Sequence, residues 1–205
     1  TGDSIFGGTS LYFDGNDYVY IQGNKEFNFS NKNFNIEMWV KPDPSSPSMG
    51  TNGSYGVLAT TASPINFGGF ILGINPNYSI YWGLSNSTTS WPYSGNSNRP
   101  ISTNSWSHLS LTREQDTVSL YINGELDTFR NISGLSLNNP NDLIQIGGRS
   151  LNNQYYKGYI DELRITTGIS RYSLVDTSYE FYTNQDPFYT KTSLLLDTQN
   201  NNISD

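Results

Sequence analysis

Alternating apolar and polar positions are clearest over residues 106–124, WSHLSLTREQDTVSLYING. Every second residue of the first half, from Trp106 to Thr112, falls on one face, and the second half repeats this with Val118, Leu120 and Ile122 on its apolar side. A period of two indicates β-strands, because successive side chains leave opposite sides of a strand. Asn123-Gly124 tolerates positive φ and therefore predicts a second hairpin into residues 125–129.

The same alternation recurs along most of the chain. It is strongest over residues 34–41, where Phe34, Ile36, Met38 and Val40 share one side. Val19 and Ile21 are likewise expected to point inward. Further strands are predicted over residues 10–13, 18–21, 56–60, 67–74, 78–84, 143–147 and 159–166. About a dozen short strands with regular turn signals predict an all-β fold, a two-sheet antiparallel sandwich of jelly-roll type.

Two polar stretches interrupt the strands. Residues 42–54 contain three prolines, which exclude a central strand there. Residues 85–105 form a longer polar stretch carrying Trp91, Tyr93 and Arg99 among serines and asparagines. Long loops in compact domains are usually functional or disordered, so the second stretch is a candidate binding loop.

Composition narrows the function classes. The 205 residues carry a net charge of −7 and contain no cysteine, which excludes disulfides, thiolate nucleophiles and Cys-based zinc sites. The few Lys and Arg residues are scattered, so we expect no nucleic-acid partner. We also expect no membrane insertion, because no apolar run is long enough to span a bilayer. The chain begins at Thr1 without a signal-peptide pattern, which predicts a processed product or a fragment.

Three segments carry a family resemblance. They are W-x-H-x-x-L-x-R followed by V-x-L-Y-x-N-G at 106–124, G-T-S-L-Y-F-D-G-N-D-Y-V-Y-I at 8–21, and G-Y-I-D-E-L-R-I-T-T-G-I-S-R-Y-S at 158–173. Together they resemble laminin G-like, concanavalin A-like domains over residues 4–173, and most closely those of bacteriophage and other viral structural proteins. The resemblance implies a concanavalin A-like sandwich on a virion surface or in the extracellular space.

The C-terminal part departs from the pattern. Residues 1–173 are predicted to form the sandwich, and 174–205 a linker with one extra strand at 193–197. In viral laminin G-like repeats a similar S-L-L-L segment opens the domain. Either 193–197 begins a following repeat, or it pairs beside residues 160–166 as a circularly permuted strand.

Asp161 is the candidate metal ligand. In Y-I-D-E-L-R-I it has the parity of Tyr159, Leu163 and Ile165, so the pattern points a carboxylate to the apolar side. Such a carboxylate needs hydrogen-bond donors, a cation or a metal. One reading is a hydrogen-bonded Asp at a strand end. The other, implied by the resemblance, is calcium held by Asp161 with Asp14, Gly15 and Asp17 of the early turn.

Catalytic arrangements are absent from the sequence. Glycosidases of this architecture need paired carboxylates, but Glu37 stands alone and Asp161 and Glu162 point to opposite faces. His108 is the sole histidine, with no nucleophile-elbow sequence and no second zinc ligand, so we interpret it as a hydrogen-bonded sheet residue. We therefore predict that the domain is not an enzyme.

Aromatic residues in polar surroundings are the ligand candidates, since rings match the apolar faces of sugars and Asn or Ser matches their hydroxyls. The alternative is that these rings pack under their own loops. The candidates are Trp82, Trp91, Tyr93, Arg99, Tyr155 and Tyr156. The predicted function is recognition of a glycan or host-surface component on a particle. The alternatives are an assembly domain that contacts other particle subunits, with or without oligomerisation, and an extracellular adhesin module.

Overall fold

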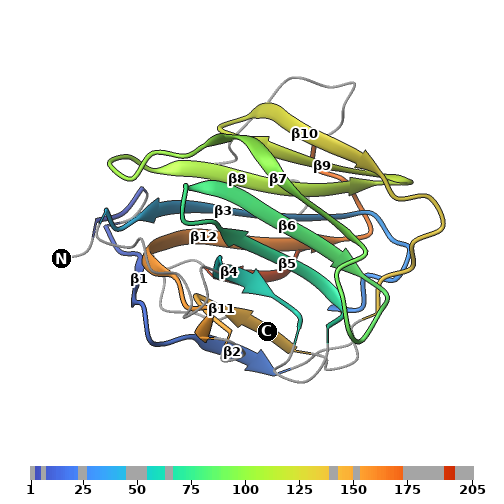
Figure 1. Ribbon diagram of the computed structural model, residues 1–205, viewed down its shortest axis with the longest axis horizontal. Helices are drawn as coiled ribbons and strands as arrows, with labels where there is room; N and C mark the ends of the chain where they lie inside the picture. The colour runs from blue at the N-terminus through green and yellow to red at the C-terminus, as the bar shows by residue number, and fades with distance from the viewer. Residues whose placement is uncertain are drawn as a thin grey trace.

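The computed structural model shows two antiparallel sheets packed face to face (Figure 1). It describes residues 3–5, 8–22, 27–44, 55–62, 67–138, 143–149, 153–172 and 192–196. The strands are β1 (Leu11–Asp14), β2 (Val19–Gln22), β3 (Phe34–Pro42), β4 (Gly56–Thr60), β5 (Gly69–Ile74), β6 (Ser79–Ser85), β7 (Tyr93–Pro100), β8 (Ser107–Glu114), β9 (Thr117–Ile122), β10 (Glu125–Asn131), β11 (Leu143–Ile146), β12 (Lys157–Thr167) and β13 (Thr192–Leu196).

The strand order confirms the predicted sandwich. One sheet has seven strands in the order β1-β12-β3-β8-β9-β10, with β13 also paired to β12, and the other has six in the order β2-β11-β4-β5-β6-β7. All pairings within them are antiparallel. The described residues contain no helix long and apolar enough to cross a membrane.

The inward positions of both sheets form one core. Ile36, Leu109 and Leu120 of the seven-stranded sheet are fully or almost fully buried in the same cluster as Leu72 and Trp82 of the six-stranded sheet. This is the expected result of period-two strands that each have one apolar side. The predicted inward set Phe34, Ile36, Met38 and Val40 is confirmed.

The central meander forms as predicted. β8 pairs with β9, and β9 pairs with β10 after a turn at Asn123 and Gly124. Both turn residues have positive φ, 52° and 81°, which Asn and Gly adopt more easily than other residues. Polar residues of β8, including His108 and Ser110, therefore lie on the side of the sheet away from the core.

Two expectations about local structure are wrong. Residues 85–105 are not a continuous loop, because Tyr93–Pro100 forms β7 at the edge of the six-stranded sheet. The polar sequence of β7 is typical of a loop, so the pattern did not predict the strand. β7 pairs with β6 and contacts β10, where the Asn98 N–H donates to Asp127 Oδ1 at 2.6 Å. Val19 is 43% exposed rather than inward, because β2 is the opposite edge strand.

The C-terminal strand lies in the seven-stranded sheet. β13 pairs with β12 in a register that places Leu194 opposite Ile165 and Leu196 opposite Leu163. This is the pairing that the circular-permutation alternative requires. The connecting residues 173–191 lie outside the described residues, as do the predicted domain boundary and the end of the chain after 196.

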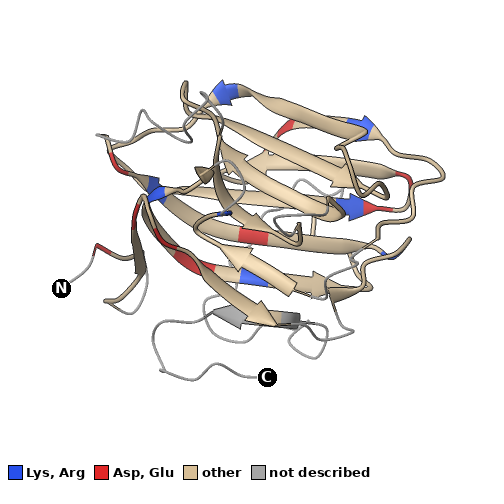
Figure 2. Ribbon diagram, turned by 60° about the horizontal axis from the view of Figure 1, so that its bottom comes forward, with Lys and Arg blue, Asp and Glu red and all other residues tan. Residues whose placement is uncertain are grey.

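Charged residues are sparse on the described surface. Figure 2 shows them scattered over strands and strand ends, with no broad area of a single sign on the face in view.

Candidate functional site

The side chains that carry chemistry lie on one surface of the seven-stranded sheet. We call this the outer face, the side turned away from the six-stranded sheet. Antiparallel pairing arranges its residues in rows that cross the strands. The first row contains Tyr12, Tyr159 and Lys41, with Trp106 beside it, and we call these the open half.

Two other rows of the outer face are buried except for a partly exposed Arg164, and we call them the covered half. One row is Arg164, Glu37, Ser110 and Tyr121, and the other is Thr166, Asn35, Thr112 and Ser119. The row between the two halves contains Asp161, Trp39 and His108.

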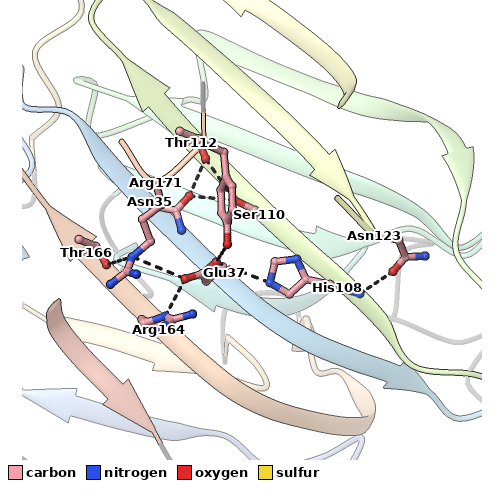
Figure 3. Close-up of polar contacts among 10 residues, drawn as sticks. Asn35, Glu37, His108, Ser110, Thr112, Asn123, Arg164, Thr166 and Arg171 are labelled. Carbon is pink, nitrogen blue, oxygen red and sulfur yellow. Dashed lines mark hydrogen bonds and ion pairs between the residues drawn. The ribbon is translucent and has the colours of Figure 1, made fainter. Parts of the chain in front are cut away.

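Glu37 is the centre of the covered half (Figure 3). It is fully buried, and its Oε1 accepts a hydrogen bond from Arg164 Nε at 2.6 Å. Its Oε2 accepts one from the Tyr172 hydroxyl at 2.5 Å and lies 3.6 Å from His108 Nε2. A second cation, Arg171, has its Nε 3.7 Å from Oε1. The buried carboxylate is therefore compensated on both oxygens.

Residues 170–172 lie over this half of the sheet and are attached to it by these contacts. The Arg171 Nε donates to Thr166 Oγ1 at 2.7 Å, and the Tyr172 ring lies 5.9 Å from the Tyr121 ring. Beneath them, the Ser110 and Thr112 hydroxyls donate to Asn35 Oδ1. The segment that follows β12 thus closes a polar layer against the outer face.

The ionisation of the cluster follows from its surroundings. Burial alone would raise the pKa of Glu37, but the hydrogen bond with His108, the charge of Arg164 and the Tyr172 hydroxyl outweigh burial and hold that pKa at about 2. Burial lowers the pKa of His108, against the opposing effect of Glu37. At neutral pH the cluster therefore contains an ionised Glu37 and a neutral His108.

These properties do not suit catalysis by Glu37. An acid–base residue works with a pKa near the operating pH and within reach of a substrate, whereas Glu37 is ionised at neutral pH, paired on both oxygens and buried. The hydrogen-bonded sheet histidine predicted at position 108 agrees with its burial and its contacts to Glu37 and Trp39. The sequence did not reveal the cluster. The one feature of the sequence that could have indicated it is the Arg171-Tyr172 pair near the end of the third family segment.

The open half exposes aromatic rings instead. Tyr12 is 46% exposed, and Tyr159 and Trp106 are half-buried. The ring centroid of Tyr159 lies 4.8 Å from that of Tyr12 and 6.2 Å from that of Trp106. Sequence reasoning missed all three, because each was assigned to an ordinary strand position. Their alignment becomes visible only from the register of β1, β12 and β8.

Charged side chains border these rings. Asp3 Oδ1 accepts a hydrogen bond from Trp106 Nε1 at 3.1 Å, and Asp3 Oδ2 pairs with Lys41. Hydrogen bonding from Lys41 and then from Trp106 lowers the pKa of Asp3, so it stays ionised at neutral pH. On the other side, Asp43 lies 3.7 Å from Lys157 Nζ and accepts from the Tyr12 hydroxyl at 3.5 Å.

Two of the predicted ligand residues belong to the core, which corrects their assignment. Trp82 is 2% exposed and packs between the sheets, and its indole lies over Gly95. Tyr156 is fully buried, donates its hydroxyl to the Tyr159 carbonyl at 3.1 Å and has its pKa raised well above 10 by burial. Both are large rings on inward positions, so neither reaches a ligand at the surface.

Of the other four predicted ligand residues, Tyr93 and Arg99 lie on β7 and Trp91 lies just before it, whereas Tyr155 lies elsewhere. Trp91 is half-buried against Gly83 on the outer side of the six-stranded sheet, and Tyr93 lies under Arg130 with its centroid 5.6 Å from the guanidinium carbon. Arg99 forms an ion pair with Glu125 at 2.7 Å. Tyr155 stacks on Tyr18 at 6.3 Å. Tyr18 directly precedes β2, the edge strand opposite β7, so Tyr155 is not beside the other three.

The structure places Asp161 on the opposite face from the one predicted, with its carboxylate hydrogen-bonded as the first of the two interpretations expects. A bulge follows it, with Glu162 at φ 50°, so Asp161 shares the outward parity of Tyr159 while Leu163 returns to the core. Its carboxylate accepts backbone N–H bonds from Ile5 at 3.1 Å and Glu162 at 3.0 Å. The prediction that Asp161 faces the core is wrong because the bulge inserts one extra residue, which reverses the alternation of faces after Asp161.

Asp161 lies away from the turn residues with which it was predicted to bind calcium. Asp14, Gly15 and Asp17 form a hydrogen-bonded turn in which the Asp14 N–H donates to Asp17 Oδ1 at 3.3 Å. Asp14 pairs with Lys157 across β1 and β12. Asp161 lies four residues further along β12, about 13 Å from Lys157 along the strand. Among the described residues, no three His, Cys, Asp or Glu side chains are grouped to hold a metal. Calcium binding stays a prediction.

Comparison with known families matches the fold. A laminin G-type family model described as the concanavalin A-like lectin/glucanases superfamily matches residues 13–169. The chain belongs to this superfamily. A search of curated proteins finds no match.

Solved structures with low sequence identity share the superfamily sandwich. A putative carbohydrate-binding protein from Bacteroides ovatus aligns with a TM-score of 0.68 and 16% identity over 96% of this chain and 52% of its own. The binding domain of Paraclostridial Mosquitocidal Protein 1 aligns with a TM-score of 0.64 and 19% identity over 78% of this chain and 40% of its own. Domain 4 of AbnA, an extracellular arabinanase from Geobacillus stearothermophilus, was solved in complex with arabinotriose. It aligns with a TM-score of 0.59 and 21% identity over 82% of this chain and 74% of its own. The chain thus spans about half or less of the first two.

Proposed function

We propose that this chain is a non-catalytic glycan-binding module whose binding surface is the open half of the outer face. The observation that carries the proposal is the row of Tyr12, Tyr159 and Trp106, partly exposed on a strand surface and bordered by charged groups. Aromatic rings pack against the apolar faces of sugars, while carboxylates and ammonium groups bond to sugar hydroxyls.

The comparisons support this class of function. One similar structure is described as a putative carbohydrate-binding protein, and another is an arabinanase domain solved with arabinotriose. The buried state of Glu37 supports a binding role over hydrolysis, because this carboxylate is withdrawn from solvent and serves to hold residues 170–172. Receptor binding is the competing interpretation, since a toxin binding domain shares the fold.

Glycan-array binding followed by titration calorimetry tests the proposal. We expect wild-type protein to bind a subset of glycans and Tyr159→Ala or Trp106→Ala to lose about tenfold or more in affinity, which corresponds to the ~1.4 kcal/mol expected of an aromatic contact. Tyr20→Ala is the matched control, because Tyr20 is 61% exposed but lies on β2 of the other sheet. Equal affinity for all variants would place the site elsewhere. Absence of any glycan binding would favour a protein receptor.

Location on a particle surface is a separate proposal that rests on the resemblance to viral laminin G-like repeats. Immunogold labelling of purified particles with an antibody raised against this domain would test it. Surface labelling is the expected result, and labelling confined to secreted, particle-free protein would point to an extracellular module instead.

Calcium is kept as a proposal of lower rank. If Asp14 and Asp17 bind it, calcium chloride should raise the melting temperature, and Asp17→Asn should abolish that rise. An unchanged melting temperature in calcium chloride and in EDTA would exclude a stabilising calcium site at the turn.

A further inference from the structure

We infer that the open half selects uncharged, extended oligosaccharides that lie across the strands, with one sugar unit on each of the three rings. This inference rests on the proposed function and specifies the ligand class of the same site. It follows from three features of the open half, which are the spacing of the rings, their tilt and the balance of the charges beside them.

Ring spacing sets the direction and length of the ligand. Tyr12, Tyr159 and Trp106 follow one another with centroids 4.8 Å and 6.2 Å apart, in a line that crosses β1, β12 and β3 toward β8. Neighbouring strands are themselves about 4.8 Å apart, which is close to the length of one sugar unit. A chain lying across the strands can therefore place successive units on successive rings, whereas a monosaccharide contacts one of them.

Ring tilt excludes a flat ligand. The planes of Tyr12 and Tyr159 are inclined by 51°, and those of Trp106 and Tyr159 by 54°. A crystalline polysaccharide presents coplanar sugar faces and matches coplanar rings. Tilted rings instead suit a soluble chain whose units rotate relative to one another.

Charge balance favours an uncharged ligand. The bordering groups are two carboxylates and two ammonium groups, combined in the pairs Asp3–Lys41 and Asp43–Lys157. An anionic sugar would have to displace a carboxylate from its lysine, and it would also approach a chain with a net charge of −7.

Asp3 is the expected acceptor for sugar hydroxyls. Each oxygen of an ionised carboxylate has more than one acceptor site, so both oxygens can accept a hydrogen bond from a sugar hydroxyl while keeping their bonds from Trp106 and Lys41. The Asp3 side chain is 40% exposed, so a ligand can reach it.

Three series of oligosaccharides test the inference by calorimetry. They are neutral arabino- and cello-oligosaccharides from one to six units, acidic oligogalacturonides of the same lengths, and α2,3-sialyllactose. We expect at least one neutral series to bind, with affinity rising at least tenfold from one to three units and changing less than threefold beyond. Acidic ligands should bind at least tenfold more weakly, and microcrystalline cellulose should not retain the protein.

Substitution of Asp3 separates the possible outcomes. Asp3→Asn should weaken neutral binding about tenfold, and Asp116→Asn, an acidic residue on the β8–β9 turn, is the control. Preferred binding of the acidic series, reduced by Tyr159→Ala, would overturn the inference and leave the proposed function intact. Equal affinity for one and three units would also overturn it. Failure of every series to bind would contradict both the inference and the proposed function.

Discussion

The two halves of the outer face use the same strands in opposite ways. In the covered half, Glu37, Arg164 and Tyr172 satisfy one another under residues 170–172, and Glu37 is fully withdrawn from solvent. In the open half, Tyr12 and Tyr159 leave ring surface in contact with water. Polar groups that are buried must be paired, whereas exposed rings are available to a ligand, as we propose for the open half. Residues 170–172 cover the first of these halves and so account for its burial.

The largest expected effect is on the stability of the covered half. Glu37→Ala leaves Arg164 and Arg171 facing each other without a carboxylate, so the free energy of unfolding should fall by about 3–5 kcal/mol. Urea denaturation measures the change. Glu125→Ala breaks the surface pair with Arg99 and should cost at most about 1 kcal/mol. Similar losses for both variants would mean that the cluster is not an anchor.

Acid should weaken the covered half in two stages. His108 has a folded-state pKa below 6.5, so the unfolded chain binds more protons and stability falls as pH drops below 6.5. Glu37 has a folded pKa of about 2 against an ordinary 4.5, so stability falls again, by about 3 kcal/mol, as pH drops from 4.5 toward 2. Urea midpoints measured from pH 8 to pH 3 test this. In Glu37→Gln the second stage should shrink, and an unchanged profile would contradict the assignment.

An intermediate effect is expected for Tyr172→Phe. The change removes a hydroxyl that donates to a charged carboxylate, a bond worth about 1.5–3 kcal/mol, but keeps the ring beside His108 and Tyr121. The expected loss appears in chemical denaturation, together with faster proteolysis near residues 170–172. Tyr20→Phe serves as the exposed control. An equal effect of the two changes on the free energy of unfolding would mean that the hydrogen bond from Tyr172 to Glu37 does not contribute to stability.

The smallest expected effect on stability comes from the open half. Tyr12→Ala removes an exposed ring and should change the free energy of unfolding by less than about 0.5 kcal/mol, while lowering glycan affinity several-fold. Thermal melts and calorimetric titrations of the same preparation separate the two quantities. A large loss of stability with unchanged affinity would reverse the roles assigned to the two halves.

The fold was largely predictable because it depends on local alternation. Phe34 to Val40 and the Asn123-Gly124 turn carry their information within a few residues, and the structure follows both. β7 was missed because its serines and asparagines resemble a loop, and only pairing with β6 and β10 makes it a strand. Asp161 was assigned to the wrong face because one residue with positive φ, Glu162, reverses the parity of the strand.

The candidate site was much less predictable because it depends on register. Tyr12 and Tyr159 are separated by 146 intervening positions but are direct neighbours across β1 and β12. Glu37 and Tyr172 meet only because the chain returns over the sheet after β12. Sequence reasoning selected rings by their polar flanking residues, which placed weight on Trp91 and on Trp82, and the second of these lies in the core.

Fluorine NMR of protein labelled with 5-fluorotryptophan tests the binding surface most directly. The chain has four tryptophans, which lie at the open half (Trp106), between the halves (Trp39), in the core (Trp82) and on the other sheet (Trp91). Single Trp→Phe variants assign the four signals. With a glycan selected from the array, the account predicts that the Trp106 signal shifts and the Trp82 and Trp91 signals stay in place. A shift at Trp91 with Trp106 unchanged would contradict it.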